Sequence, residues 1–320
     1  MEFFSEFFSY LGGTAPSIAA QGMIWGIMAI GVFITFRILD IADLTVDGSI
    51  VTGAAVCIVA FQSGMNIWIA ILLATLAGMV CGLVTGLLHT ALGIPPILAG
   101  ILTQQSLWTV NLALAGSSLS FTFFEQDLLP VVPLEERIGN TDLILLGFVA
   151  VVIAILYWFF GTELGASLRA TGNNPNMSRA QGINTSFAKV LGLVISNGIV
   201  ALSGALLVQY SNGYNINMGR GAIVIGLAAV VVGEAIVSKI SSGFIPRLIG
   251  VILGGIIYFL VYQLVLFFDI NADLLKMLSA AIIAVFLGIG TAIGKVNGHR
   301  GVTAGGENLD SAQLSGSFQA

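Results

Sequence analysis

The sequence predicts an all-α polytopic membrane protein, and three features support this fold class: few charges, many glycines and repeated long apolar segments. Hydrophobic residues make up 57% of the 320 residues and charged residues only 8%. A soluble domain carries roughly 25% charged residues, so this chain could not build a water-exposed surface. The 40 glycines fit the same class, because small residues let membrane helices approach closely.

Apolar segments that could cross a membrane recur along most of the chain. A spanning helix needs about 20 largely apolar residues, and by that criterion we expect about nine spans, with a range of about eight to ten. They lie at 17–36, 48–62, 67–88, 95–114, 143–160, 188–208, 221–238, 245–267 and 274–294. We therefore expect a transmembrane domain over 17–295, an interfacial helix over 1–16 and a disordered cytoplasmic tail over 296–320.

The distribution of Lys and Arg predicts the orientation of the chain. The most basic loop, 161–187, is expected in the cytoplasm, because basic residues are retained on that side. The largest external loop is then 115–142, with the amino terminus outside and the carboxyl terminus inside. An even number of spans would move only the amino terminus. This orientation places eight basic residues inside: Arg37, Arg169, Arg179, Lys189, Lys239, Arg247, Lys295 and Arg300. It places three outside: Arg137, Arg220 and Lys276.

Two polar segments interrupt the apolar pattern directly before a span, and they predict two broken or re-entrant helices. The segment 37–47 carries three aspartates, and the segment 209–220 is rich in asparagine and glycine. Broken helices in transporters expose backbone groups along the substrate path. We therefore predict a translocation path that includes Asp43, Thr45, Asp47 and Asn215.

Polar residues inside apolar spans allow two interpretations. Gln104 and Asn197 could line the path or could hydrogen-bond to neighbouring helices, since polar groups in hydrocarbon need a partner or water. Glu234 is a candidate path residue because it is an acid within a span. Its alternative is a residue at the cytoplasmic end paired with Lys239. Likewise, the glycines at 78, 82 and 86 could serve packing within the chain or a subunit interface.

No pattern for catalysis, metal binding, a cofactor or nucleic acid occurs in the sequence, so we expect a protein that is not itself an enzyme. His89 and His299 are far apart, and Cys57 and Cys81 both fall in apolar spans. The segment 290–296 has the wrong spacing for a phosphate-binding loop and ends in Val instead of Ser or Thr. We therefore expect no nucleotide site.

Three segments resemble one family of transport proteins. Residues 41–49 read Ile-Ala-Asp-Leu-Thr-Val-Asp-Gly-Ser, and residues 95–103 read Pro-Pro-Ile-Leu-Ala-Gly-Ile-Leu-Thr. The cytoplasmic loop reads Leu-Arg-Ala-Thr-Gly-Asn-Asn-Pro from 168 and Arg-Ala-Gln-Gly-Ile-Asn from 179. Their order and spacing resemble the permease family of bacterial ABC importers that includes the ribose and branched-chain amino-acid permeases. The departure is Asp47, one extra residue before the glycine of the first segment.

The resemblance implies the transmembrane subunit of an ATP-driven importer in the bacterial cytoplasmic membrane. It implies as partners a second permease protomer, cytosolic ATP-binding subunits and an extracytoplasmic substrate-binding lipoprotein. The substrate class it implies is a small polar solute, an amino acid, with aromatic amino acids included. The loop would couple ATP hydrolysis to transport through Arg169, Gly172, Asn173, Asn174, Pro175, Arg179 and Gly182. The alternative is an ion-coupled secondary transporter, which would need intramembrane carboxylates such as Glu234 or Asp47.

Overall fold

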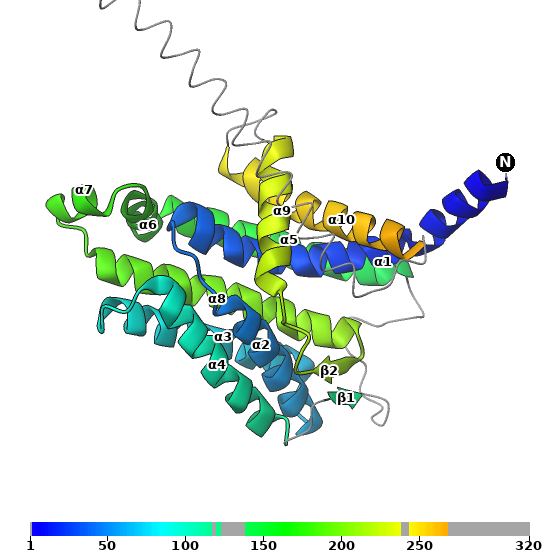
Figure 1. Ribbon diagram of the computed structural model, residues 1–320, viewed down its shortest axis with the longest axis horizontal. Helices are drawn as coiled ribbons and strands as arrows, with labels where there is room; N and C mark the ends of the chain where they lie inside the picture. The colour runs from blue at the N-terminus through cyan, green and yellow to red at the C-terminus, as the bar shows by residue number, and fades with distance from the viewer. Residues whose placement is uncertain (1, 117–119, 123–137, 238–242, 268–320) are drawn as a thin grey trace, which may run out of the picture.

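Helices make up nearly all of the computed structural model, which describes residues 2–116, 120–122, 138–237 and 243–267 (Figure 1). The helices are α1 (Glu2–Phe33), the π-helix η1 (Ile34–Ile38), α2 (Val46–Gln62), α3 (Ile67–Thr90), α4 (Pro96–Leu114), α5 (Ile138–Gly161), α6 (Glu163–Asn173), α7 (Pro175–Ala180), α8 (Thr185–Tyr210), α9 (Ala222–Val237) and α10 (Phe244–Phe267). Eight of the nine predicted spans coincide with these helices. The ninth span, at 274–294, and the predicted tail lie outside the described residues.

Six of the described helices are long and apolar enough to cross a membrane, whereas α2 and α9 are shorter. These two have 17 and 16 residues. At 1.5 Å per residue such helices reach about 25 Å, less than the roughly 30 Å of a hydrocarbon core. Both follow the polar segments that predicted broken helices, so the irregular chain before each one completes its crossing.

The two ends of the molecule differ in structure and in charge. Helices α6 and α7 lie at one end, and the strands and the start of α1 lie at the other (Figure 1). Of the described basic residues, Arg220 belongs to the strand end. The α6 end holds Arg37, Arg169, Arg179, Lys189 and Arg247. By the positive-inside rule we expect the α6 end to be cytoplasmic, which is the orientation predicted for the loop 161–187.

Helix α8 lies between α1, α2 and α3, and glycines permit this close packing. A methyl group at Gly78 or Gly82 of α3 would overlap the backbone of α8, and one at Gly53 of α2 would overlap the carbonyl of Ala201. Gly254 of α10 approaches Ala229 of α9 in the same way. The structure thus supports packing within the chain for these glycines.

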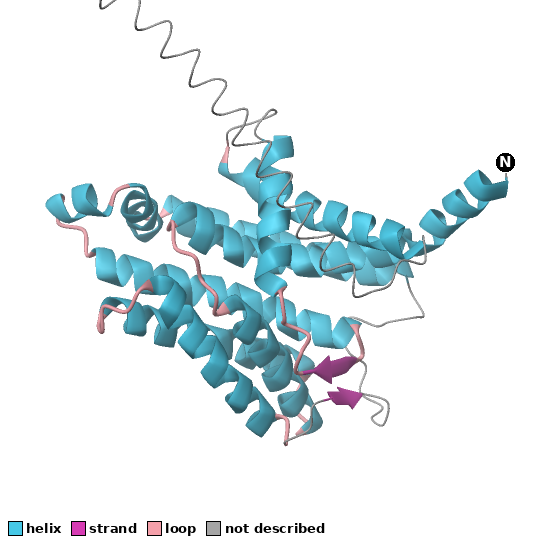
Figure 2. Ribbon diagram, viewed as in Figure 1, coloured by secondary structure: helices cyan, strands magenta, loops and turns pink. Residues whose placement is uncertain are grey.

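Both polar segments are irregular, and their details differ from the prediction. After η1 the chain is irregular over 39–45, and Asp40 adopts a left-handed φ of 56°. After α8 a short strand, β2 (Gly213–Asn215), pairs antiparallel with β1 (Ser120–Thr122), as Figure 2 shows. The sequence did not predict this pair, because three-residue strands leave no periodic pattern. Residues 2–16, expected in a separate interfacial helix, continue without a break into α1.

Candidate functional site

Helices α6 and α7 form a compact knob at the cytoplasmic end, and side-chain caps explain its shape. The hydroxyl of Thr162 accepts a hydrogen bond from the amide of Gly165 at the start of α6. Asn174 Oδ1 accepts from the amides of Asn176 and Met177 at 3.1 and 3.0 Å, which starts α7 directly after α6. Pro175 occupies the first turn of α7, where its missing amide hydrogen costs nothing.

The surface of this knob combines exposed apolar side chains with polar ones. Leu164 of α6 and Met177 of α7 are 50% and 56% exposed, and Phe187 in the first turn of α8 is 53% exposed. Asn173 and Arg179 are exposed beside them, and Arg179 Nε donates to the hydroxyl of Thr185 at 2.9 Å. Exposed apolar groups rimmed by polar residues are typical of a protein-binding surface, which is the kind of surface that the sequence predicts for this loop.

Arg169 has a different environment from the one expected of a docking residue. Its Nη2 donates to the carbonyl of Phe160 at 3.0 Å, at the end of α5. A cation at a helix carboxyl terminus satisfies an otherwise unpaired carbonyl and complements the helix dipole. Arg169 therefore fixes α6 against α5, and its contact with a partner stays a prediction.

Gly172 joins the knob to the first irregular segment. A methyl group at position 172 would overlap the carbonyl oxygen of Ile38 and would lie 2.9 Å from Cα of Leu39. The side chain of Leu39 in turn lies against Gly192 of α8, next to Leu168 of α6. A movement of α6 must therefore displace the chain at 38–39 as well.

Beyond that point, Asp43 anchors the irregular segment to α8. Asp43 is 3% exposed, and its Oδ2 accepts from Asn197 Nδ2 at 2.7 Å while its Oδ1 accepts from the amide of Thr45 at 2.9 Å. Ser49 Oγ donates to Asn197 Oδ1 at 2.6 Å. Three predicted path residues, Asp43, Thr45 and Asn197, are thus brought together, but inside the protomer and hydrogen-bonded to one another.

Threonine hydroxyls extend this cluster to two further helices. Thr45 Oγ1 lies 2.8 Å from Thr85 Oγ1 of α3, and Thr85 lies 2.9 Å from Thr103 Oγ1 of α4. All three hydroxyls are buried. The segment between η1 and α2 is therefore fastened to α3, α4 and α8 at once.

Asp47 connects the two short helices. Its Oδ2 accepts from the amide of Gly221 at 3.0 Å, and its Oδ1 accepts from the amide of Ile223 at 2.8 Å. A carboxylate at this place caps the free amides at the start of α9 and complements its dipole. The extra residue found in the sequence thus joins the start of α2 to the start of α9.

The remaining predicted path residues lie apart from this cluster. Gln104 is half-buried on α4, where its backbone packs against Gly48 of α2. Glu234 forms an ion pair of 3.0 Å with Arg37 at the cytoplasmic end. Lys239, the partner considered from sequence, lies outside the described residues. Asn215 is exposed and lines a cavity at the outer end.

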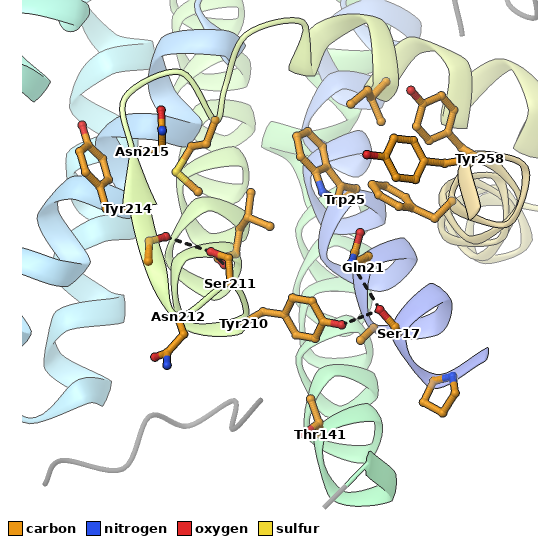
Figure 3. A pocket seen from close by; sticks show the side chains of 18 of the residues that line it. Ser17, Gln21, Trp25, Thr141, Tyr210, Ser211, Asn212, Tyr214, Asn215 and Tyr258 are labelled. Atoms are coloured by element: carbon orange, nitrogen blue, oxygen red, sulfur yellow. Dashed lines mark hydrogen bonds between the residues drawn. The ribbon is translucent and has the colours of Figure 1, made fainter. Parts of the chain in front are cut away.

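This outer cavity has a volume of about 1020 Å³ and is bordered by α1, α5, α8, α9, α10 and β2 (Figure 3). The hydroxyls of Tyr210 and Ser17 share a hydrogen bond of 3.0 Å, and Gln21 Nε2 donates to Ser17 at 3.4 Å. Sequence reasoning missed this site. One signal was present: Ser17, Gln21 and Trp25 recur at intervals of four and so share one face of α1.

The family comparison identifies the class of protein. A sequence model described as "Branched-chain amino acid transport system / permease component" matches residues 15–287. The chain belongs to this permease family. It is therefore the permease of an ABC importer and a multi-pass membrane protein, which confirms the resemblance drawn from its sequence.

Individual relatives support the same assignment. The permease is 36% identical over 280 residues to the tyrosine transport system permease protein of Clostridioides difficile (strain R20291), covering 86% of this chain and 90% of that protein. It is 30% identical to an uncharacterized protein of Rickettsia prowazekii (strain Madrid E), and the match covers 83% of this chain and 94% of that protein. It is also 30% identical to a nucleoside ABC transporter permease protein of Lactococcus lactis subsp. cremoris (strain MG1363), over 49% of this chain and 47% of that protein. No solved structure matches.

Proposed function

We propose that this permease forms the translocation pathway for amino acids, aromatic ones included, in an ATP-driven importer of a bacterial cytoplasmic membrane. The tyrosine permease relative supports this substrate class, since its match covers 86% of this chain. A second permease protomer completes the membrane domain. Cytosolic ATP-binding subunits and an extracytoplasmic substrate-binding lipoprotein complete the importer.

The observation that carries the coupling part of this proposal is the contact between Gly172 and Ile38. Because α6 packs directly against Ile38 and Leu39, a displacement of α6 would shift these residues and, a few residues further along the chain, Asp43. The ATP-binding subunit would bind Met177, Asn173 and Arg179, which are exposed at the tip.

Other residues of the knob have supporting roles in the proposal. Asn174 and Pro175 set the turn between α6 and α7. Gly182 follows α7 with a φ of 84°, a conformation that glycine adopts without strain. Together they give the knob one shape, so that a force applied at its tip moves α6 as a rigid body.

The translocation path in this proposal follows the two irregular segments. Asp43, Thr45 and Asn197 act by holding the first segment, because their polar atoms already bond to each other. Asp47 links that segment to the second one through α9. A change in the first segment would therefore be passed to the second. Gln104, Asn215 and Glu234 remain proposed path residues at three different depths of the molecule.

The test uses purified permease reconstituted with its ATP-binding subunits and its binding protein. Uptake of labelled tyrosine should require ATP on the side of the knob. A matched preparation with an ATP-binding subunit that cannot hydrolyse ATP should take up none. Uptake driven by a proton or sodium gradient alone would instead support the secondary-transporter alternative.

A further inference from the structure

The outer cavity reaches deep into the protomer. It is lined along α1 from Gly13 to Trp25, and between these two residues the helix rises by about 18 Å. The apolar span that contains them runs from Tyr10 to Ile38, so the cavity extends from the outer surface to about the middle of the membrane. A volume of about 1020 Å³ is ample for a small molecule, since ligand pockets occupy roughly 300–1,000 Å³.

Helices α1 and α9 pack directly against each other beside the deep end of the cavity. One turn beyond Trp25, a methyl group at Gly226 of α9 would lie 2.8 Å from Val32 and 3.1 Å from the sulfur of Met28, both on α1. Helices α1 and α9 therefore touch below the cavity. Asp47, which caps α9, holds this helix in place.

One wall of the cavity is aromatic. The ring centroids of Trp25 and Phe259 are 6.0 Å apart, those of Tyr258 and Phe259 are 5.5 Å apart, and those of Phe259 and Tyr262 are 5.8 Å apart. All four residues line the cavity, and Figure 3 shows Trp25 of α1 beside Tyr258 of α10. Such a wall offers ring faces and edges to a planar apolar group, at distances suited to aromatic pairs.

The same cavity carries one positive and one negative side chain. Arg220, before α9, and Asp142, on α5, both line it. Within the part of the chain that the structure describes, neither has an ion-pair partner within 4.0 Å, whereas Arg37 and Glu234 do pair. Opposite charges that do not neutralise each other fit a ligand that itself carries both signs.

We propose that the outer cavity is a binding site for an aromatic amino acid in its zwitterionic form. The carboxylate of the ligand binds the guanidinium of Arg220, which can donate two parallel hydrogen bonds. The ammonium group binds the carboxylate of Asp142, and the ring lies against Trp25 and Tyr258. This inference rests on the proposed import function and adds that the permease itself, not only the binding protein, selects the solute.

The chemistry of the cavity separates this ligand from others that the family transports. A neutral sugar or nucleoside would form no ion pair with Arg220, which is exposed, or with Asp142, so it would gain less from this site than a zwitterion. A branched-chain amino acid would satisfy the charges but would not pair with the aromatic wall. Phenylalanine and tyrosine are the ligands that use both features.

The experiment measures binding of labelled phenylalanine to the purified permease with its ATP-binding subunits in nanodiscs, without binding protein. Competitors are phenethylamine, 3-phenylpropionate, leucine and galactose. Unlabelled phenylalanine should displace the labelled ligand better than any of these four compounds. Loss of either charged partner should weaken phenylalanine binding by about tenfold or more, as expected for a charge-assisted hydrogen bond. Arg220→Gln should reduce the preference for phenylalanine over phenethylamine, which lacks the carboxylate. Asp142→Asn should reduce the preference for phenylalanine over 3-phenylpropionate, which lacks the ammonium group.

Two controls make the result decisive. Arg247→Gln removes an exposed charge at the cytoplasmic end and should leave binding unchanged. Trp25→Leu should weaken phenylalanine more than leucine. If the permease imports tyrosine with ATP but Arg220→Gln and Asp142→Asn leave binding and competition unchanged, this inference fails and the import function stands. If phenylalanine binds as described but ATP drives no uptake, the import function fails instead.

Discussion

Asn197 of α8 donates a hydrogen bond of 2.7 Å to the carboxyl group of Asp43, and 154 residues separate the two. Asn197 also accepts from Ser49 at 2.6 Å, so both ends of its amide are engaged. This contact holds the irregular segment between η1 and α2 inside the protomer. Asn197 could therefore contact the transported solute or could only stabilise the folded protomer.

We expect Asn197→Leu to destabilise the permease by about 2–4 kcal/mol, because the carboxyl of Asp43 and the hydroxyl of Ser49 each lose a buried partner. The measurement is the thermal unfolding midpoint in detergent, with Gln105→Leu on the exposed face of α4 as the control. Equal midpoints for the two variants, with a loss of uptake in Asn197→Leu alone, would show that Asn197 lines the path.

Asp47→Ala should lower stability by about 1–2 kcal/mol, the usual cost of losing a helix cap. Asp47→Asn keeps one oxygen acceptor, so its effect should be smaller. Both variants loosen α9 from α2, and uptake should fall in the same order. The check is uptake and unfolding measured on the same preparations. An Asn variant as damaging as the Ala variant would contradict the cap.

Gly172→Leu should separate ATP hydrolysis from transport, since the new side chain forces α6 away from Ile38. The assembled importer should still hydrolyse ATP, but the number of solute molecules taken up per ATP should fall by about tenfold or more. Gly161→Leu is the matched control, because no atom lies within 4 Å of a methyl group there. Wild-type coupling in Gly172→Leu would refute the mechanical link.

Met177→Asp should weaken binding of the ATP-binding subunits, because it places a charge in the apolar part of the knob surface. The measurement is the yield of ATP-binding subunit that co-purifies with tagged permease. Met65→Asp, which is 44% exposed at the outer end, should leave that yield unchanged. If both variants retain the full yield, the subunits dock elsewhere.

Features that depend on local sequence were predictable. Apolar length placed eight of the described helices, and the excess of basic residues placed the loop 161–187 at one end. The polar segments before α2 and α9 marked the two irregular stretches, because charged and amide side chains rarely occur in hydrocarbon without a reason.

Features that depend on distant partners were not predictable. The ion pair of Arg37 with Glu234 joins residues 197 positions apart, and no local pattern distinguishes it from a pair with Lys239. The bond from Arg169 back to the carbonyl of Phe160 depends on how α6 folds against the end of α5, and the sequence shows no sign of it. The outer cavity combines residues from five helices and two strands, so it exists only after the chain has packed.

The most direct test of the central claim is uptake of labelled tyrosine into proteoliposomes that contain the permease, its ATP-binding subunits and its binding protein. Our account predicts uptake that requires ATP at the face carrying α6 and α7 and that falls by about tenfold or more when Gly172→Leu breaks the contact with Ile38. Uptake at the same rate without ATP-binding subunits, driven by a sodium or proton gradient, would contradict it.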